Sequence, residues 1–148
     1  MDWRLLTEPS ETLADGVTEH LVEHNIAVSD AVRLRFEPAN LKSHPLQAFA
    51  VDGDGVLLGG CTGHTEDVWH WLTIDLMWVD PSLRGTGLGT ALLTSVEDEA
   101  RARGCRWSKL NTWEFQAPEF YEKCGYEVYA REVDYPPGHV NHLMRKEL

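Results

Sequence analysis

The chain has 148 residues, about the length of one domain, and its 43% hydrophobic and 25% charged residues are typical of neither a disordered nor a fibrous protein. With 24 acidic and 13 basic residues its net charge is −11, which disfavours nucleic-acid binding, because that binding needs Lys and Arg on the phosphates. No apolar stretch reaches the ~20 residues that span a bilayer, and the N-terminus has no basic or apolar region of a secretion signal. We therefore expect a cytoplasmic protein that binds neither nucleic acid nor membrane.

The charge is concentrated in the first half of the chain. Residues 1–80 hold 14 acidic and 4 basic residues, a net charge of −10, whereas residues 81–148 hold 10 acidic and 9 basic residues, a net charge of −1. Such a field attracts cationic ligands to the first half. The alternative interpretation is a solvated acidic surface that only maintains solubility.

Metal binding has little support in the sequence. The cysteines at 61, 105 and 124 form no CxxC pair, which disfavours a disulfide framework or a zinc knuckle. His20, Glu23 and His24 match the HxxEH pattern of inverted zinc peptidases. No distal ligand motif accompanies that pattern and the chain is small for a peptidase, so we interpret the match as chance and expect no metal.

The first half of the sequence predicts strands and helices in alternation. A first strand is predicted at residues 2–7, and an amphipathic helix at 10–25 with Ser10 as its N-cap. Residues 28–42 are interpreted as a short helix and a loop. An Asp-Gly-Asp-Gly turn then joins two strands of a hairpin, because glycine accepts the positive φ of a tight turn; these strands are predicted at 47–51 and 56–61, and a long central strand follows at 68–79.

The second half continues the mixture. A loop at 80–87 leads to a helix with an apolar stripe, which begins at residue 88 and ends at Gly104, a natural C-cap. The elements predicted after it are a strand at 106–113, a short helix at 117–123, and strands at 126–133 and 140–146. One α/β (α+β layered) domain over residues 1–148 is therefore expected.

A glycine-rich turn joins the long strand to the helix that begins at residue 88. Glycines let backbone N–H groups approach a ligand closely, and a helix N-terminus adds its positive dipole end. The helix contains no acidic residue before Glu97, so no carboxylate competes for those N–H groups. A P-loop is excluded because there is no Gly-Lys pair, and a dinucleotide-binding turn because GxGxxG is absent.

The pattern that fits is Arg84-x-x-Gly87-x-Gly89 after a strand that ends in Val-Asp-Pro. It resembles the pyrophosphate-binding motif of the GNAT superfamily, the acyl-CoA-dependent N-acetyltransferases. The alternative is a helix-start loop whose glycines only allow tight packing. The resemblance extends over nearly the whole chain and implies a mixed, mostly antiparallel central sheet flanked by helices, with acetyl-CoA as co-substrate.

A second motif supports the same resemblance. Residues 120–126, Phe-Tyr-Glu-Lys-Cys-Gly-Tyr, are similar to a family signature in which the tyrosine, here Tyr121, commonly protonates the departing CoA thiolate. Many members carry an asparagine seven residues earlier that contacts the cofactor, but this chain has Glu114 there. The resemblance implies that backbone N–H groups around residues 77–79 bind the thioester carbonyl and that the turn binds pyrophosphate. The implied cofactor-binding residues are Met77, Trp78, Val79, Arg84, Gly85, Thr86, Gly87, Leu88, Gly89 and Thr90.

The reaction also needs a base, because an alkylammonium must lose a proton before it attacks the thioester. Strict strand alternation places five residues on one face of the long strand: Trp71, Thr73, Asp75, Met77 and Val79. Family members with a base on this strand place it four or six residues before the equivalent of Val79, and Asp75 is one of those two positions. We predict Asp75 as the base; the alternative is a structural Asp hydrogen-bonded across the sheet.

Four other residues are candidates for the base: Glu66, Asp67, His70 and His139. His139 follows a Pro-Pro-Gly turn between the last two strands, which often border the acceptor site in the family, although a turn-exit histidine without a role is the alternative.

Together these features predict an N-acetyltransferase that acts by direct attack of a primary amine on acetyl-CoA in a ternary complex. The charge favours a small cationic amine as the acceptor. A peptide or protein amine, and a non-catalytic acyl-CoA-binding sensor, are the alternatives. The sequence leaves open whether the protein is a homodimer.

Overall fold

The computed structural model describes residues 3–148, which divide into two compact units at Leu41 and Lys42. The first unit holds α1 (Glu11–Val28), α2 (Asp30–Arg35) and a 3-10 turn η1 (Pro38–Asn40). Ser10 caps α1 by accepting the N–H of Leu13, as predicted, and Ser29 caps α2 in the same way. Residues 3–7 form no strand, so the predicted first strand is wrong over them, and position 2 lies outside the described residues. A strand needs a neighbouring strand for its N–H and C=O groups, and residues 3–7 have none.

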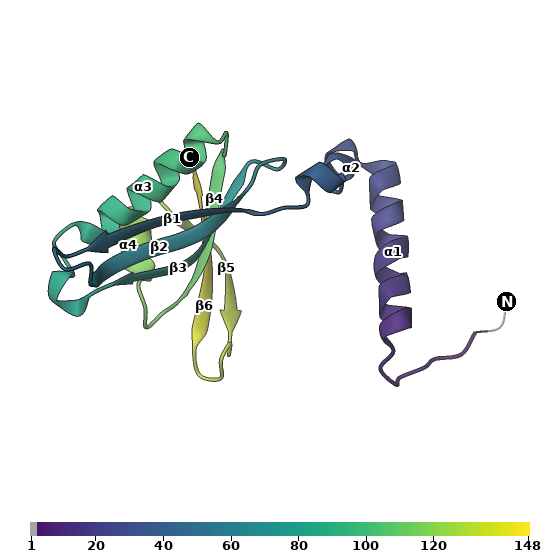
Figure 1. Cartoon of the computed structure of the whole chain (residues 1–148). Coiled ribbons are helices and arrows are strands. Elements are labelled where there is room, and N and C mark those ends of the chain that lie inside the picture. The colour runs from purple at the N-terminus through teal and green to yellow at the C-terminus, as the bar shows by residue number, and fades with distance from the viewer. Residues whose placement is uncertain (1–2) are drawn as a thin grey trace. The chain divides into compact units, whose positions relative to one another are not determined.

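The second unit is built on a six-stranded sheet with the order β1-β2-β3-β4-β6-β5 (Figure 1). Only the β3–β4 pair is parallel, so the predicted mixed, mostly antiparallel sheet is confirmed. The strands are β1 (His44–Val51), β2 (Leu57–Glu66), β3 (Trp71–Val79), β4 (Trp107–Trp113), β5 (Glu127–Val133) and β6 (Val140–Glu147).

Two helices flank this sheet and enclose the core. α3 (Leu88–Ala102) follows a 3-10 turn, η2 (Pro81–Leu83), and packs on β1, β2 and β3, while the short α4 (Pro118–Lys123) contacts β5 (Figure 1). Leu93 and Val96 of α3 are buried against Leu72 of β3 and Met144 of β6 in one apolar cluster. In the described part of the chain no helix is long and apolar enough to cross a membrane.

The predicted strand boundaries move at both sides of the turn between β2 and β3. β2 continues five residues beyond the predicted end at 61, and β3 begins at Trp71 instead of 68. The reason is a turn at residues 67–70, in which His70 has a positive φ of 61° that no strand residue adopts.

The parallel pair β3–β4 opens partway along its length. Its register runs only from Trp71↔Trp107 to Thr73↔Lys109. Beyond Thr73 the rest of β3, residues 74–79 apart from Asp75, stays paired with β2 but not with β4. A gap in backbone hydrogen bonding therefore opens between the carboxyl-terminal halves of β3 and β4, as Figure 1 lets the reader follow.

A β-bulge in β3 accompanies this opening. Gly63 of β2 is paired with Ile74 and Thr62 with Leu76, so Asp75 is an extra residue without a partner on β2. Asp75 and Leu76 are both exposed, whereas Met77 and Val79 pack against the apolar core with Ile74. The prediction that Asp75 shares a face with Met77 and Val79 is therefore wrong, because the inserted residue reverses the alternation of the strand.

Candidate active site

The glycine-rich loop, residues 84–90, has an open backbone. Gly85 and Gly87 have φ of 77° and 94°, and a Cβ added to either would meet nothing within 4 Å. Before the loop, the Asp80 carboxylate accepts the Ser82 N–H at 2.8 Å, and donation by the Ser82 hydroxyl and N–H lowers the pKa of Asp80. The turn η2 thus fixes the chain before the loop, and the missing side chains of Gly85 and Gly87 leave the loop backbone accessible.

The start of α3 presents unpaired donors. Gly87 is its N-cap and supplies no side-chain acceptor, and the first helical bond runs from the Ala91 N–H to the Gly87 carbonyl at 3.0 Å. Within residues 3–148, five loop N–H groups donate to no protein acceptor: those of Gly85, Gly87, Leu88, Gly89 and Thr90. A row of free N–H groups at a helix N-terminus is a site for an anion such as a phosphate.

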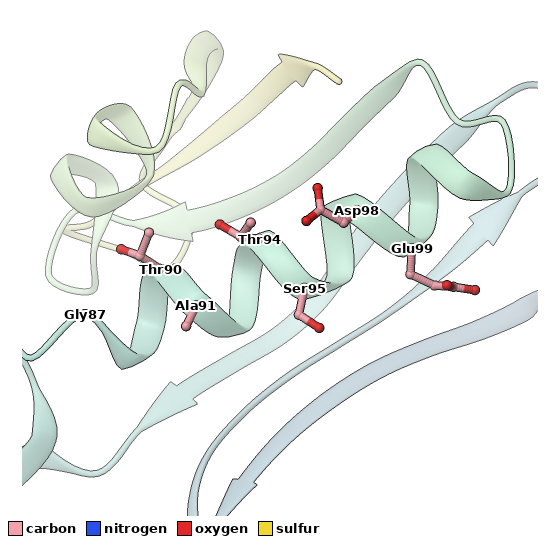
Figure 2. A pocket seen from close by; sticks show the side chains of 7 residues that line it. All are labelled: Gly87, Thr90, Ala91, Thr94, Ser95, Asp98 and Glu99. Atoms are coloured by element: carbon pink, nitrogen blue, oxygen red, sulfur yellow. The ribbon is translucent and has the colours of Figure 1, made fainter.

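A shallow, open pocket continues from this loop along the outer side of α3. Figure 2 shows its lining side chains following one side of the helix from the loop end: Gly87, Thr90, Ala91, Thr94, Ser95, Asp98 and Glu99. The two acidic residues lie at the far end, where Asp98 pairs with Arg101 at 2.7 Å and Glu99 with Arg103 at 2.9 Å. The loop end of the pocket is therefore the end suited to an anion.

The open end of β3 supplies two further donors. The Asp80 N–H donates to the Leu58 carbonyl of β2 at 2.9 Å. Because successive N–H groups of a strand point to opposite edges, the N–H groups of Val79 and Met77 point to the edge that β4 has left, and that of Trp78 points to β2. Two N–H groups thus enter the gap between β3 and β4.

The two predicted motifs meet beside that gap. A Cβ added to Gly89 would lie 3.4 Å from both the Phe120 ring and the Met77 Cε. The Cys124 thiol shares a side-chain hydrogen bond with Thr90. The structure therefore brings together the glycine-rich loop, the end of β3 and the helix that carries the Phe-Tyr-Glu-Lys motif.

Tyr121 lies within this junction. Its side chain is 8% exposed and meets Phe120 and Tyr126 edge-on, with ring centroids 5.1 and 5.8 Å apart. Burial raises the pKa of Tyr121 to about 12, so its hydroxyl is protonated at neutral pH. It is a hydrogen-bond donor there, and a weak acid.

Glu114 and His139 form a pair at the open end of β4. The Glu114 carboxylate binds His139 Nδ1 at 2.6 Å and accepts the Val140 N–H at 2.9 Å, and the Phe115 ring meets His139 edge-on at 4.8 Å. These hydrogen bonds, His139 first, lower the pKa of Glu114. The side chain that replaces the family's asparagine is thus held by the start of β6.

Asp75 also has a histidine partner, which the sequence analysis missed. Its carboxylate lies 3.0 Å from Nδ1 of His64 on β2. Extending the second hairpin strand to 66 would have placed His64 in that strand, but only the register of β2 against β3 places it beside Asp75.

The remaining candidate bases lie elsewhere. Glu66, Asp67 and His70 sit at the turn where β3 begins, at the end of the strand remote from the glycine-rich loop, and Asp67 pairs with His44. In the described residues no group of three His, Cys, Asp or Glu side chains is arranged to hold a metal ion.

Comparison with known proteins now identifies the fold. The family described as "Acetyltransferase (GNAT) family" matches residues 12–126. This chain belongs to the GNAT family. It is 43% identical over 124 residues to blasticidin-S acetyltransferase from Streptomyces morookaense, and the alignment covers 81% of this chain and 90% of that relative. The predicted family membership and the N-acetyltransferase activity are thereby shown.

Solved structures agree. The crystal structure of an acetyltransferase from Bacillus cereus superposes with a TM-score of 0.76 at 30% identity over 98% of both chains. An aminoglycoside 6'-N-acetyltransferase complexed with coenzyme A gives a TM-score of 0.62 at 19% identity over 80% of this chain and 78% of that one, a likeness of fold alone. GNAT acetyltransferases use acetyl-CoA, and the unpaired loop N–H groups suit its pyrophosphate.

Proposed function

We propose that this GNAT N-acetyltransferase acetylates the primary amine of a small cationic molecule, by direct attack on acetyl-CoA in a ternary complex. The observation that carries the chemistry is the junction of Gly89, Met77 and Phe120, where unpaired N–H groups, an open strand edge and a buried tyrosine adjoin. A thioester acyl transfer requires these parts: a binding site for the pyrophosphate of the cofactor, hydrogen-bond donors to the thioester carbonyl and a proton donor.

The loop residues have separate tasks in this proposal. The N–H groups of Gly85, Gly87, Leu88, Gly89 and Thr90 hold the pyrophosphate, while Arg84 and Thr86 flank it. The N–H groups of Met77 and Val79 bind the thioester carbonyl, where negative charge develops as the amine adds. Trp78 fixes that segment of β3 through its pairing with Gly60 of β2.

Two protons must also move. Tyr121 donates its hydroxyl hydrogen to the departing sulfur, from a position four residues after the Ala117 N-cap of α4. Asp75 and His139 each belong to a histidine–carboxylate pair able to receive the proton of the ammonium group.

The charge distribution and the comparisons support the class of acceptor. Residues 1–80 carry a net charge of −10, which favours a cation over an anion. The 43% identical relative is a blasticidin-S acetyltransferase, so blasticidin S is the first acceptor to test on this chain. The family match includes residues of both compact units, which supports one functional domain over residues 1–148. We place this enzyme in the cytoplasm.

The experiment is a thiol-release assay with acetyl-CoA against blasticidin S, a polyamine and an aminoglycoside. Lysine-containing peptides and neutral or acidic amines are the comparison set. We expect thiol release with at least one of the small cationic amines and a weaker rate with the comparison set. Activity confined to neutral or acidic acceptors contradicts the proposal, activity confined to peptides favours the peptide alternative, and acetyl-CoA binding without thiol release from any amine indicates a sensor.

A further inference from the structure

We infer that His64 receives the proton of the acceptor amine and that Asp75 positions His64; this rests on the proposed function. The sequence analysis favoured Asp75 as the base over four other candidates and named no partner for it. The structure instead places the Asp75 Oδ2 3.0 Å from His64 Nδ1, so the carboxylate already has a partner and the imidazole stands beyond it.

The pairing determines which nitrogen accepts a proton. An ionised carboxylate has no hydrogen to donate, so the hydrogen of this bond belongs to His64 Nδ1. The neutral ring then carries its free lone pair on Nε2, and Nε2 contacts no hydrogen-bonding group of the described chain. The His64 side chain is 34% exposed, so Nε2 is open to a ligand.

The pair sits where β3 leaves β4. His64 is paired with Thr73, the last residue of β3 that also pairs with β4. Asp75, the bulged residue, comes two residues after Thr73. Met77, whose N–H enters the gap, is two residues beyond Asp75, about 7 Å along the strand. The proton acceptor is therefore next to the proposed position of the thioester carbonyl.

The surroundings suit an organic cation. On the same sheet face, Leu76 is 73% and Trp78 45% exposed on one side of the pair, and Trp71 stacks on Trp107 on the other side at 5.6 Å. Aromatic faces attract cations. The charged groups around His64 and the tryptophan stack on this face are Asp75, Glu66 of the same strand, Lys109 of β4 and Arg145 of β6. Lys109 Nζ lies 5.7 Å from the Trp71 ring and the Arg145 guanidinium 5.4 Å from the Trp107 ring, so Trp78 is the aromatic side chain offered to a cationic ligand.

The other two histidine–carboxylate pairs of the second unit are less well placed. His44 and Asp67 lie at the turn where β3 begins. In the Glu114–His139 pair, Glu114 also holds the Val140 N–H, which ties it to the connection between β4 and β6 and gives that pair a structural task. Only the His64–Asp75 pair lies on the strand whose N–H groups enter the gap.

The proton balance of the step is complete without another reactant. The ammonium gives one proton to His64 Nε2, which later releases it to water. The amine nitrogen then bonds to the acetyl carbon as the carbon–sulfur bond breaks. The nitrogen loses its second proton to solvent, and the sulfur gains one from Tyr121, which solvent re-protonates.

The test compares His64→Gln and Asp75→Asn with His139→Gln, which removes the rival base, and with His44→Gln, the matched control from the pair at the remote turn. Each variant is assayed with blasticidin S or the most active amine of the panel, over a range of pH. We expect His64→Gln to lower kcat/KM by ~10²–10⁴-fold at neutral pH. That loss should narrow at higher pH, because the neutral fraction of a lysine-like amine rises about tenfold per pH unit below its pKa. Asp75→Asn should show a smaller loss with the same pH dependence, and the acetyl-CoA-induced shift in Tm should persist in all variants.

Three results overturn the inference: wild-type kcat/KM in His64→Gln at neutral pH, a loss that is constant with pH, or a pH-dependent loss in His139→Gln instead. If His64→Gln does not fold, Asp75→Asn gives the same decision by its pH profile. Absence of thiol release by the wild-type protein with every amine overturns the proposed function and this inference together, which distinguishes it from a wrong base in an active enzyme.

Discussion

A side chain on Gly63 would overlap the carbonyl oxygen of Thr73 on the neighbouring strand. Gly63 is paired with Ile74, directly before the bulged Asp75. The missing side chain thus lets β3 bend at the point where it parts from β4. Asp75 keeps the sheet face of Thr73, the residue paired with His64, and the bulge sends Met77 to the core side.

Gly63→Ala is therefore expected to damage both stability and catalysis. The neighbour is backbone, which cannot move aside cheaply, so we expect a loss of ~1–3 kcal/mol in the free energy of unfolding together with a lower kcat. Urea unfolding and thiol release measure the two effects. Gly53→Ala is the matched control, because a Cβ there meets nothing within 4 Å. Equal stabilities of Gly63→Ala and Gly53→Ala would contradict the bulge's dependence on Gly63.

The parts of the fold that the sequence predicted well are those with strong local signals. Ser10 as a cap, the turn glycines and the stripe of α3 each act within a few residues, so α1, the turn of the hairpin and the start of α3 were found close to where they are observed. The bulge at Asp75 was missed because its cause, Gly63, lies on another strand and has no local signature. One extra residue then reversed the predicted face of Met77 and Val79.

The candidate site was likewise predictable where its residues lie close together in the sequence. Residues 84–90 and Tyr121 lie in contiguous motifs, and the structure brings those motifs together at Gly89 and Phe120. The pairs His64–Asp75 and Glu114–His139 join residues 11 and 25 positions apart, and only the strand register brings such residues within hydrogen-bond distance. The sequence could nominate Asp75 and His139 singly, but not their partners.

Gly87→Glu tests the proposed phosphate-binding site at residues 84–90. The substitution places a carboxylate among the unpaired loop N–H groups, so the acetyl-CoA-induced rise in Tm should disappear. Gly55→Glu is the control, because Gly55 has a similar positive φ of 82°, equally open surroundings and a place in the β1–β2 hairpin. Both variants bear similar backbone strain, so a loss of the Tm shift in both, or in neither, would argue against a phosphate site at residues 84–90.

Tyr121→Phe tests the proton donor. The ring and its contacts with Phe120 and Tyr126 remain, and only the hydroxyl is lost. If the hydroxyl protonates the departing sulfur, kcat should fall by ~10²–10⁴-fold while the Kd for acetyl-CoA changes little. A pKa of about 12 makes full proton transfer to a free thiolate unfavourable, so transfer should accompany carbon–sulfur cleavage. Retention of most of kcat when chemistry limits the rate would assign protonation to water.

Alkaline pH should destabilise the fold through two buried acids. Burial, and then the charge of Glu97, raises the pKa of Cys61 from 9.0 to about 12, and burial raises the pKa of Tyr121 from 10.0 to about 12. Between its pKa in the unfolded chain and its pKa in the folded chain, each group has lost its proton in the unfolded chain but keeps it in the folded one. The stability present below about pH 9 therefore declines as pH rises toward 12.

Urea unfolding between neutral pH and pH 11 measures this decline as a falling free energy of unfolding, by at most ~1.4 kcal/mol per pH unit for each group. The double variant Cys61→Ala/Tyr121→Phe is expected to start less stable at neutral pH, because the small cavity at position 61 loses packing, and then to decline less steeply. Tyr126, whose pKa burial also raises and whose hydroxyl lies 2.7 Å from Ser108 Oγ, keeps some slope in both proteins. Identical slopes for the wild type and the double variant would mean that neither buried group governs the alkaline transition.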